Sequence, residues 1–159
     1  MEDNSGIIDA SQIQTLIALE AIETRIHGLC IDLDTGDEAA AQGAFTPDAV
    51  CAHGPFRGPA LDYVAASIGR RLPQLSPYGW HLTSHRARTS GTAAWAETYA
   101  IASAAAGHDQ LMCGLRLLDT FEHRDGEWLI AHREAVLDWT FCWPRANAAA
   151  PSQLNGEGN

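Results

Sequence analysis

Residues 93–141 read AAWAETYAIASAAAGHDQLMCGLRLLDTFEHRDGEWLIAHREAVLDWTF. This segment contains three long runs of strand-forming residues, at 93–104, 111–123 and 128–141. The last two runs are joined through Asp125-Gly126, a dipeptide typical of the turn of a β-hairpin. A further alternating run at 81–89 precedes the turn Ser90-Gly91. The pattern predicts a meander of long antiparallel strands in the second half of the chain.

The beginning of the chain has a helical pattern instead. Asp9 and Gln12 have the spacing of a capping box, and the helix that follows is expected to end at Thr35-Gly36. Apolar residues recur in this helix at spacings of three and four, which indicates one face packed on a core: Leu19, Ile22, Ile26, Leu29 and Leu33.

Shorter elements connect the helix to the strands. We expect an alanine-rich helix at 37–43, a turn at 45–48, a strand at 49–53 and a third helix from 59 to about 72. Helices followed by a run of strands predict an α+β fold, with a curved sheet wrapped around the long first helix. The predicted domain spans residues 1–143, and residues 144–159, rich in Ala, Pro, Ser, Gly and Asn, are expected to form a flexible tail.

Composition and charge narrow the function. The 159 residues carry 20 acidic against 10 basic side chains, a formal net charge of −10. The electrostatic field of this negative charge repels nucleic acids and anionic lipid surfaces, so we expect neither as a partner. No apolar run is long enough for a membrane span, and residues 1–9 lack the pattern of a secretory signal. Four scattered cysteines suit free thiols, which favours a cytoplasmic protein that acts on a small molecule.

Several kinds of chemistry are poorly supported by the motifs. On a strand, His81 and His85 would stand about 13 Å apart at ~3.3 Å per residue, too far to share one metal ion. The sequence has no HExxH motif, and Asp32, Asp34 and Asp37 miss the register of a calcium loop. It also lacks a GxSxG elbow, a reactive-cysteine signature and a glycine-rich phosphate loop. We therefore expect neither a metal nor a cofactor.

A carboxylate and a histidine remain as candidates for acid–base chemistry. Asp34 falls at the end of the first helix, where it either caps the chain or holds an imidazole in one tautomer. His81 begins a strand among aromatic neighbours and is either structural or a base. Arg133 lies on an apolar strand face, so it needs a carboxylate partner or a ligand. The tryptophans either fill the core or line an aromatic pocket.

An ordered set of short motifs over residues 10–143 resembles the SnoaL-like family of the nuclear transport factor 2-like superfamily. Each motif is short, but their order along the chain matches that of the family. The segments that carry the resemblance are Leu33-Asp-Thr-Gly-Asp37, Phe45-Thr-Pro-Asp48-Ala-Val50, His53-Gly-Pro-Phe-Arg-Gly58, His81-x-x-x-His85, Ala94-Trp-Ala-Glu97-Thr-Tyr99, Gly114-Leu-Arg116-Leu-Leu-Asp119, Asp125-Gly-Glu-Trp128, His132-Arg133 and Asp138-Trp139.

The resemblance implies a cone-shaped α+β barrel around a ligand pocket, usually in a homodimer or homotrimer. It implies a cofactor-independent lyase, a dehydratase, dehydrohalogenase or retro-aldol enzyme, acting on a small apolar, aromatic molecule of a catabolic pathway. It places Asp34 at the dyad carboxylate and His81 at the base that removes a proton from carbon. The side chains expected to bind substrate are His85, Tyr99, Trp95, Arg116, Arg133 and Trp139.

Three departures from the family pattern leave the substrate open. Leu29 stands where several dehydratases have a tyrosine, His85 replaces a common asparagine, and Leu117 replaces an aromatic residue. Two alternatives to a lyase stay open. One is an isomerase, cyclase or epoxide hydrolase of the same fold, and the other is a ligand-binding module without catalysis.

Overall fold

A computed structural model describes residues 9–69, 79–106 and 109–144. Three helices come first: α1 (Ala10–Thr35), α2 (Glu38–Gly43) and, after two short strands, α3 (Ala60–Gly69). The strands are β1 (Phe45–His53), β2 (Phe56–Pro59), β3 (Gly79–Ser90), β4 (Ala93–Ala106), β5 (Asp109–Arg124) and β6 (Glu127–Pro144). This order confirms the predicted α+β class.

Helix α1 begins and ends as predicted. Asp9 caps its N-terminus, and its carboxylate and the Gln12 side chain form the two halves of a capping box. At the C-terminus Gly36 takes a left-handed conformation (φ 82°), from which its N–H reaches the carbonyl of Asp32. The chain therefore turns sharply after Thr35, and Asp34 lies in the last turn of the helix.

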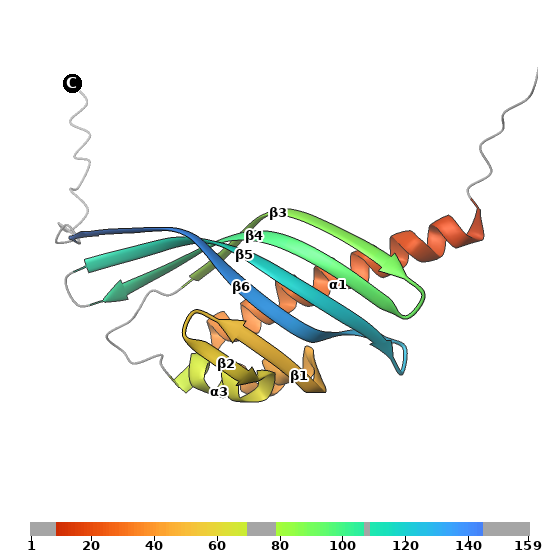
Figure 1. Ribbon diagram of the computed structural model, residues 1–159, viewed down its shortest axis with the longest axis horizontal. Coiled ribbons are helices and arrows are strands. Elements are labelled where there is room, and N and C mark those ends of the chain that lie inside the picture. Colours follow the sequence, from red (N-terminus) through yellow and green to blue (C-terminus); the bar gives the residue numbers. More distant parts are fainter. Residues whose placement is uncertain (1–8, 70–78, 107–108, 145–159) are drawn as a thin grey trace, which may run out of the picture.

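The strands form one mixed sheet in the order β2-β1-β6-β5-β4-β3 (Figure 1). Neighbouring strands are antiparallel except β1 and β6, which pair in parallel. The sheet has two edges, β2 and β3, and does not close into a barrel. Strands β3 to β6 are the predicted meander.

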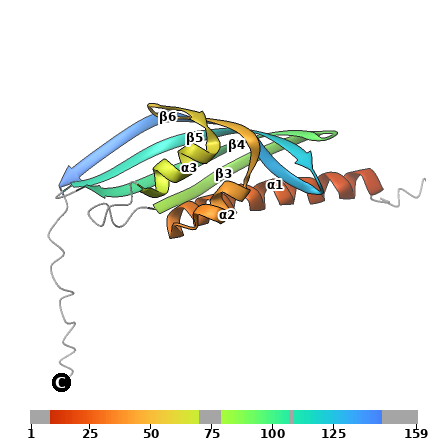
Figure 2. The ribbon, with the colours of Figure 1, turned by 90° about the horizontal axis from the view of Figure 1, so that it is seen from below.

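Helix α1 runs beneath the sheet (Figure 2). Helix α3 lies next to α1, below β1 and β2. The α1 residues Ile22, Ile26, Leu29 and Leu33 are buried against alanines of β4 and aromatic residues of β5 and β6. We call the side of the sheet that faces α1 its inner side. None of the helices in the described residues is long and apolar enough to cross a membrane.

Some predicted boundaries differ from the structure. The segment 45–48, expected as a turn, is the start of β1, whose pairing with β6 is irregular between Phe45 and Val50. Helix α3 starts at Ala60 because Pro59 still belongs to β2. Strand β6 includes Pro144, the first residue of the predicted tail. Residues 145–159 and the predicted helix end at 70–72 lie outside the described residues.

Bulges in β3 and β6 decide which side chains face α1, and one of them, in β6, makes Ala131 an extra residue between Ile130 and His132. On β3, Thr83 and Ser84 together lie opposite Tyr99, since Leu82 pairs with Ala100 and His85 with Thr98. On β6, Asp138 is an extra residue between Leu137 and Trp139. Each extra residue reverses the alternation beyond it. His81 and His85 lie on either side of the β3 bulge. They therefore point to opposite sides of the sheet although they are four residues apart.

Candidate active site

A pocket of about 360 Å³ lies between α1 and the start of β3. Asp34 and His81 both belong to its wall, so the structure brings the two predicted catalytic residues to one place. The remaining wall is largely apolar. The other lining residues are His27, Cys30, Ile31, Trp80 and Leu82.

Asp34 is held in place by the strand opposite. Its Oδ2 accepts a hydrogen bond of 3.0 Å from the backbone N–H of Trp80, the residue before His81. This bond joins the last turn of α1 to the beginning of β3. It gives Asp34 a structural role besides any chemical one.

His81 itself points away from α1 in this conformation. It pairs with Ile101, on the side of β3 opposite to Trp80 and Leu82, and it is exposed. Its Nε2 lies 3.6 Å from the position that a Cβ on Gly79 would occupy. Within the described residues no hydrogen bond joins Asp34 to His81. The dyad stays a prediction.

Arg133 has the carboxylate partner that its position on β6 requires. Its Nε and Nη2 donate to the two oxygens of Asp119 on β5, each at 2.7 Å, with both side chains almost fully buried. Burial opposes the charge of Arg133, but the charge and hydrogen bonds of Asp119 outweigh it and raise the pKa of the guanidinium. Arg133 therefore stays cationic on the inner side of the sheet.

Two thiols lie near this ion pair. Burial raises the pKa of Cys30 to about 11 and that of Cys51 to about 12, although the charge of Arg133 acts in the opposite direction. Both thiols are thus protonated at neutral pH. This electrostatic setting does not suit a thiolate nucleophile.

His85 faces α1 because of the bulge in β3. Its Nδ1 lies 2.8 Å from Oγ1 of Thr98, and its Nε2 is buried without a hydrogen-bond partner. Burial lowers its pKa; Glu23 and Asp119 raise it, while His27 lowers it further. The predicted substrate-binding residues His85 and Arg133 thus lie on the inner side.

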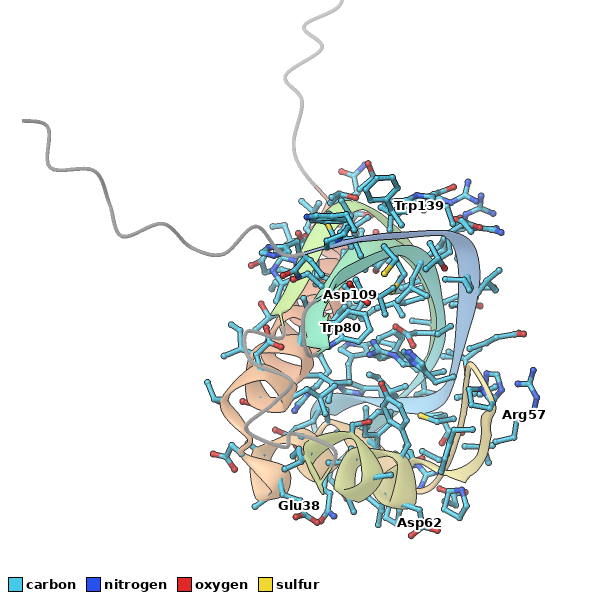
Figure 3. All side chains as sticks on the ribbon, turned by 90° about the vertical axis from the view of Figure 1, so that its left-hand side faces the viewer. Glu38, Arg57, Asp62, Trp80, Asp109 and Trp139 are labelled. Atoms are coloured by element: carbon cyan, nitrogen blue, oxygen red, sulfur yellow. The ribbon has the colours of Figure 1, made fainter. Side chains whose placement is uncertain are left out.

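The other four predicted substrate-binding residues lie on the outer side of the sheet. Trp95, Tyr99 and Arg116 alternate with the buried inner residues of β4 and β5, and Trp139 is placed there by the bulge at Asp138. Figure 3 shows Trp139 outside the arch of the sheet and Trp80 inside it. The structure therefore separates these four from Asp34.

A histidine and a tyrosine that are not among the predicted site residues meet on the inner side. His53, at the end of β1, stacks on Tyr63 of α3 with ring centroids 5.2 Å apart, and the Tyr63 hydroxyl is 3.1 Å from His53 Nδ1. The rings of Trp80 and His53 are almost perpendicular, with their centroids 5.8 Å apart. No sequence signal marks this contact, because it forms only when α3 folds back on β1.

A second hollow, of about 450 Å³, lies on another side of α1, against α2 and the β5–β6 turn. Its Arg25 donates to the carbonyl of Trp128 and lies 3.5 Å from Glu127. It is larger than the Asp34 pocket, but its arginine already has partners and no histidine lines it. Among the described residues no three His, Cys, Asp or Glu side chains form a possible metal site.

The SnoaL-like domain model matches residues 14–134, which is most of the chain. The chain belongs to the SnoaL-like family. The long helix under a curved mixed sheet is the cone fold of the nuclear transport factor 2-like superfamily, as predicted. No curated protein matches the sequence.

Solved structures share this fold at low sequence identity. A hexachlorocyclohexane dehydrochlorinase (LinA) of type 2 is 15% identical with a TM-score of 0.76, and the match covers 86% of this chain and 96% of that one. A candidate scytalone dehydratase from Novosphingobium aromaticivorans is 20% identical (TM-score 0.71; coverage 82% and 91%). LinA type 3 from Novosphingobium barchaimii is 15% identical (TM-score 0.70; coverage 83% and 92%). At these identities the likeness shows the fold.

Proposed function

We propose that the protein is a cofactor-independent lyase that acts on a small, largely apolar, aromatic molecule. The observation that carries the proposal is the shared pocket of Asp34 and His81, whose other walls are mainly apolar. Such a pocket suits a flat apolar substrate with one polar group. Dehydrochlorinases and a candidate dehydratase among the structural neighbours support the same class.

In this mechanism His81 removes a proton from carbon and Asp34 stabilises the imidazolium that forms. The pairing requires the His81 imidazole to turn toward Asp34. This is feasible because the side chain is exposed and β3 is an edge strand. A leaving group then departs from the neighbouring carbon, and the cationic Arg133 attracts the negative charge that develops.

The proposal is tested with two probes that have the same carbon skeleton. One is the aldol of benzaldehyde and acetone, a β-hydroxy ketone, and the other is its β-chloro analogue. Both eliminate to the same conjugated enone, which is measured by ultraviolet absorbance. Asp34→Asn and His81→Gln should each lower kcat about 10²- to 10⁴-fold, the usual contribution of a positioned base.

Asp32→Asn is the matched control, because Asp32 lies in the same helix but lines the other hollow. Its turnover should equal that of the wild type. A wild-type protein that eliminates neither probe, or full activity in both site variants, would contradict the lyase proposal.

We also propose that the protein forms a homodimer or homotrimer through the outer side of the sheet. Tyr99, Trp139 and Phe141 are 45%, 45% and 60% exposed there. The charges beside them are already paired, Arg116 with Asp138 across β5 and β6. Two copies that meet on this side therefore bury apolar rings beside charges that are already paired within each chain.

The oligomer is tested by sedimentation. Phe141→Asp should reduce the sedimentation mass to that of one chain, whereas Leu61→Asp, an exposed apolar residue of α3, should not change it. A wild-type mass of one chain would contradict the proposal.

A further inference from the structure

The strongest unassigned feature is the pair of His53 and Tyr63. The Tyr63 side chain is 7% exposed, so its hydroxyl is held in place by packing as well as by the contact of 3.1 Å with His53 Nδ1. The Phe56 ring packs at a tilt against the Tyr63 ring, with the two ring centroids 5.7 Å apart. A histidine whose Nδ1 is engaged by a hydroxyl has its Nε2 fixed in direction.

The pair belongs to the same inner side as the pocket. His53 is in register with Ala135 of β6, two residues after Arg133. Its ring meets Trp80, whose backbone holds Asp34 and which lines the pocket. Trp80 therefore links His53 on β1 to the Asp34 pocket between α1 and β3.

A row of inner apolar side chains leads from the pocket toward the strand that pairs with β1. Leu82 of the pocket, Ala100, Leu115 and Leu137 lie in one row across four strands. Leu137 ends this row beside Ala135 and is 58% exposed although it points to the inner side. The row therefore joins the pocket wall at Leu82 to the part of β6 that pairs with β1, and its middle members Ala100 and Leu115 are buried.

Arg133 adds a positive charge to the surroundings of the pair. Its guanidinium interacts electrostatically with the Tyr63 phenol as well as with Asp119 and Cys30. Because the same guanidinium is paired with Asp119, Tyr63 faces an ion pair and not an isolated cation.

We propose that His53 is a second catalytic residue, which protonates the leaving group, and that Tyr63 positions it and supplies the proton that it passes on. This inference rests on the proposed lyase function and extends it. It places proton removal at the α1–β3 wall and proton delivery at the β1–α3 wall.

The step balances without a co-reactant. The base takes the proton from carbon, and the electron pair of that C–H bond becomes the new C=C bond while the C–O bond breaks. The departing oxygen takes the proton from His53 Nε2 and leaves as water. His53 Nδ1 takes the phenol proton of Tyr63. The base then releases its proton to solvent, solvent returns a proton to His53 Nε2, and Nδ1 gives its proton back to the phenolate, which restores the starting state.

This arrangement identifies the substrate class as an alcohol. A hydroxyl group leaves only when it is protonated, whereas chloride leaves as a stable anion and gains little from an acid. A chain built with an acid at His53 therefore suits dehydration of a β-hydroxy compound better than loss of a halide.

The two probes described above test the inference directly. His53→Gln should lower kcat/KM for the β-hydroxy ketone about 10²-fold or more, while the rate with the β-chloro ketone changes only a few-fold. Tyr63→Phe, which removes one oxygen, should show the same selectivity. It replaces His53→Gln as the test variant if His53→Gln does not fold. Equal losses with both probes, or no loss, would overturn the assignment.

Asp34→Asn separates this inference from the proposed function. It should slow both probes, because proton removal from carbon is common to both reactions. If Asp34→Asn is fully active while His53→Gln retains its hydroxyl selectivity, the proposed base is wrong and the acid stands.

A measurement without turnover gives a second readout. In ¹⁵N spectra of the histidine rings, His53 should be a single Nε2–H tautomer that becomes mixed in Tyr63→Phe. Addition of α-methylbenzyl alcohol, an unreactive alcohol, should shift the His53 Nε2 signal. An unchanged signal and an unchanged tautomer would overturn the inference even if the wild type eliminates neither probe.

Discussion

The indole of Trp139 lies directly across the backbone of Gly114. A Cβ added to Gly114 would stand 2.1 Å from Trp139 Nε1 and 2.2 Å from Cε2, far inside van der Waals contact. Gly114 is therefore the residue that allows an aromatic ring of β6 to lie flat on β5 on the outer side of the sheet. The ring is 45% exposed, so it can move into solvent if it is displaced.

Gly114→Ala should displace the Trp139 ring with little effect on the inner side. We expect a red-shifted tryptophan emission, because the indole becomes more hydrated. The control is the same substitution in a Trp139→Phe background, where the emission should not change further. An identical red shift in both backgrounds would show that another tryptophan responds.

The buried Arg133–Asp119 pair should be costly to break. Arg133→Met leaves the fully buried Asp119 without its partner, and the loss of unfolding free energy should be about 3–5 kcal/mol. Replacing both residues, as Arg133→Met with Asp119→Leu, should restore most of the loss, because no unpaired charge remains buried.

Urea unfolding measures both changes. Arg124→Met, at an exposed site that contacts Glu122 and Asp48, is the control and should cause a much smaller loss. A double variant that is less stable than Arg133→Met alone would contradict the interpretation.

His85 should make the fold sensitive to mild acid. Burial lowers its folded-state pKa below the ordinary value of about 6.5, so the unfolded chain binds this proton more readily than the folded one. The contribution of neutral His85 to the free energy of unfolding is fully present above a pH of about 6.5. It is lost as the pH falls from there through the lowered pKa of the folded state.

His85→Gln should remove this acid sensitivity. We expect the melting temperature of the variant to fall less than that of the wild type between neutral and mildly acidic pH, measured by circular dichroism. His123→Gln, at an exposed histidine of β5, is the matched control. Parallel curves for wild type and His85→Gln would show that another group carries the transition.

The four cysteines should differ widely in reactivity. Burial raises the pKa of Cys30 to about 11 and that of Cys51 to about 12, whereas Cys142 is exposed on β6. A thiol–disulfide reagent at neutral pH should label Cys142 first. Cys142→Ser should abolish the fast phase, and urea should bring Cys30 and Cys51 into it. A fast phase that persists in Cys142→Ser would contradict this order.

The elements that sequence alone predicted are those with a repeated pattern. The apolar stripe through Ile22, Ile26 and Leu29 gave helix α1, and the Asp125-Gly126 turn gave the β5–β6 hairpin. These signals depend on spacing along the chain, which tertiary contacts do not alter.

What sequence could not predict are the bulges in β3 and β6 and the contact of His53 with Tyr63. Neither Ser84 nor Asp138 is a glycine or has any other local mark of an extra residue, yet each reverses the alternation after it. Strict alternation would place Trp139 on the face of Arg133, but the extra residue Asp138 places it on the other. The contact of His53 with Tyr63 depends on how α3 packs on β1, which no spacing encodes.

The parallel pairing of β1 with β6 makes the first strand of the chain depend on the last. During synthesis β1 and β2 emerge early, but the neighbour of β1 becomes available only after residues 127–144 have left the ribosome. Such non-local pairing slows folding, because a loop of nearly the whole domain must close first. Until then an open strand edge and the apolar face of α1 are uncovered together, so truncated chains that end before β6 should aggregate or require a chaperone.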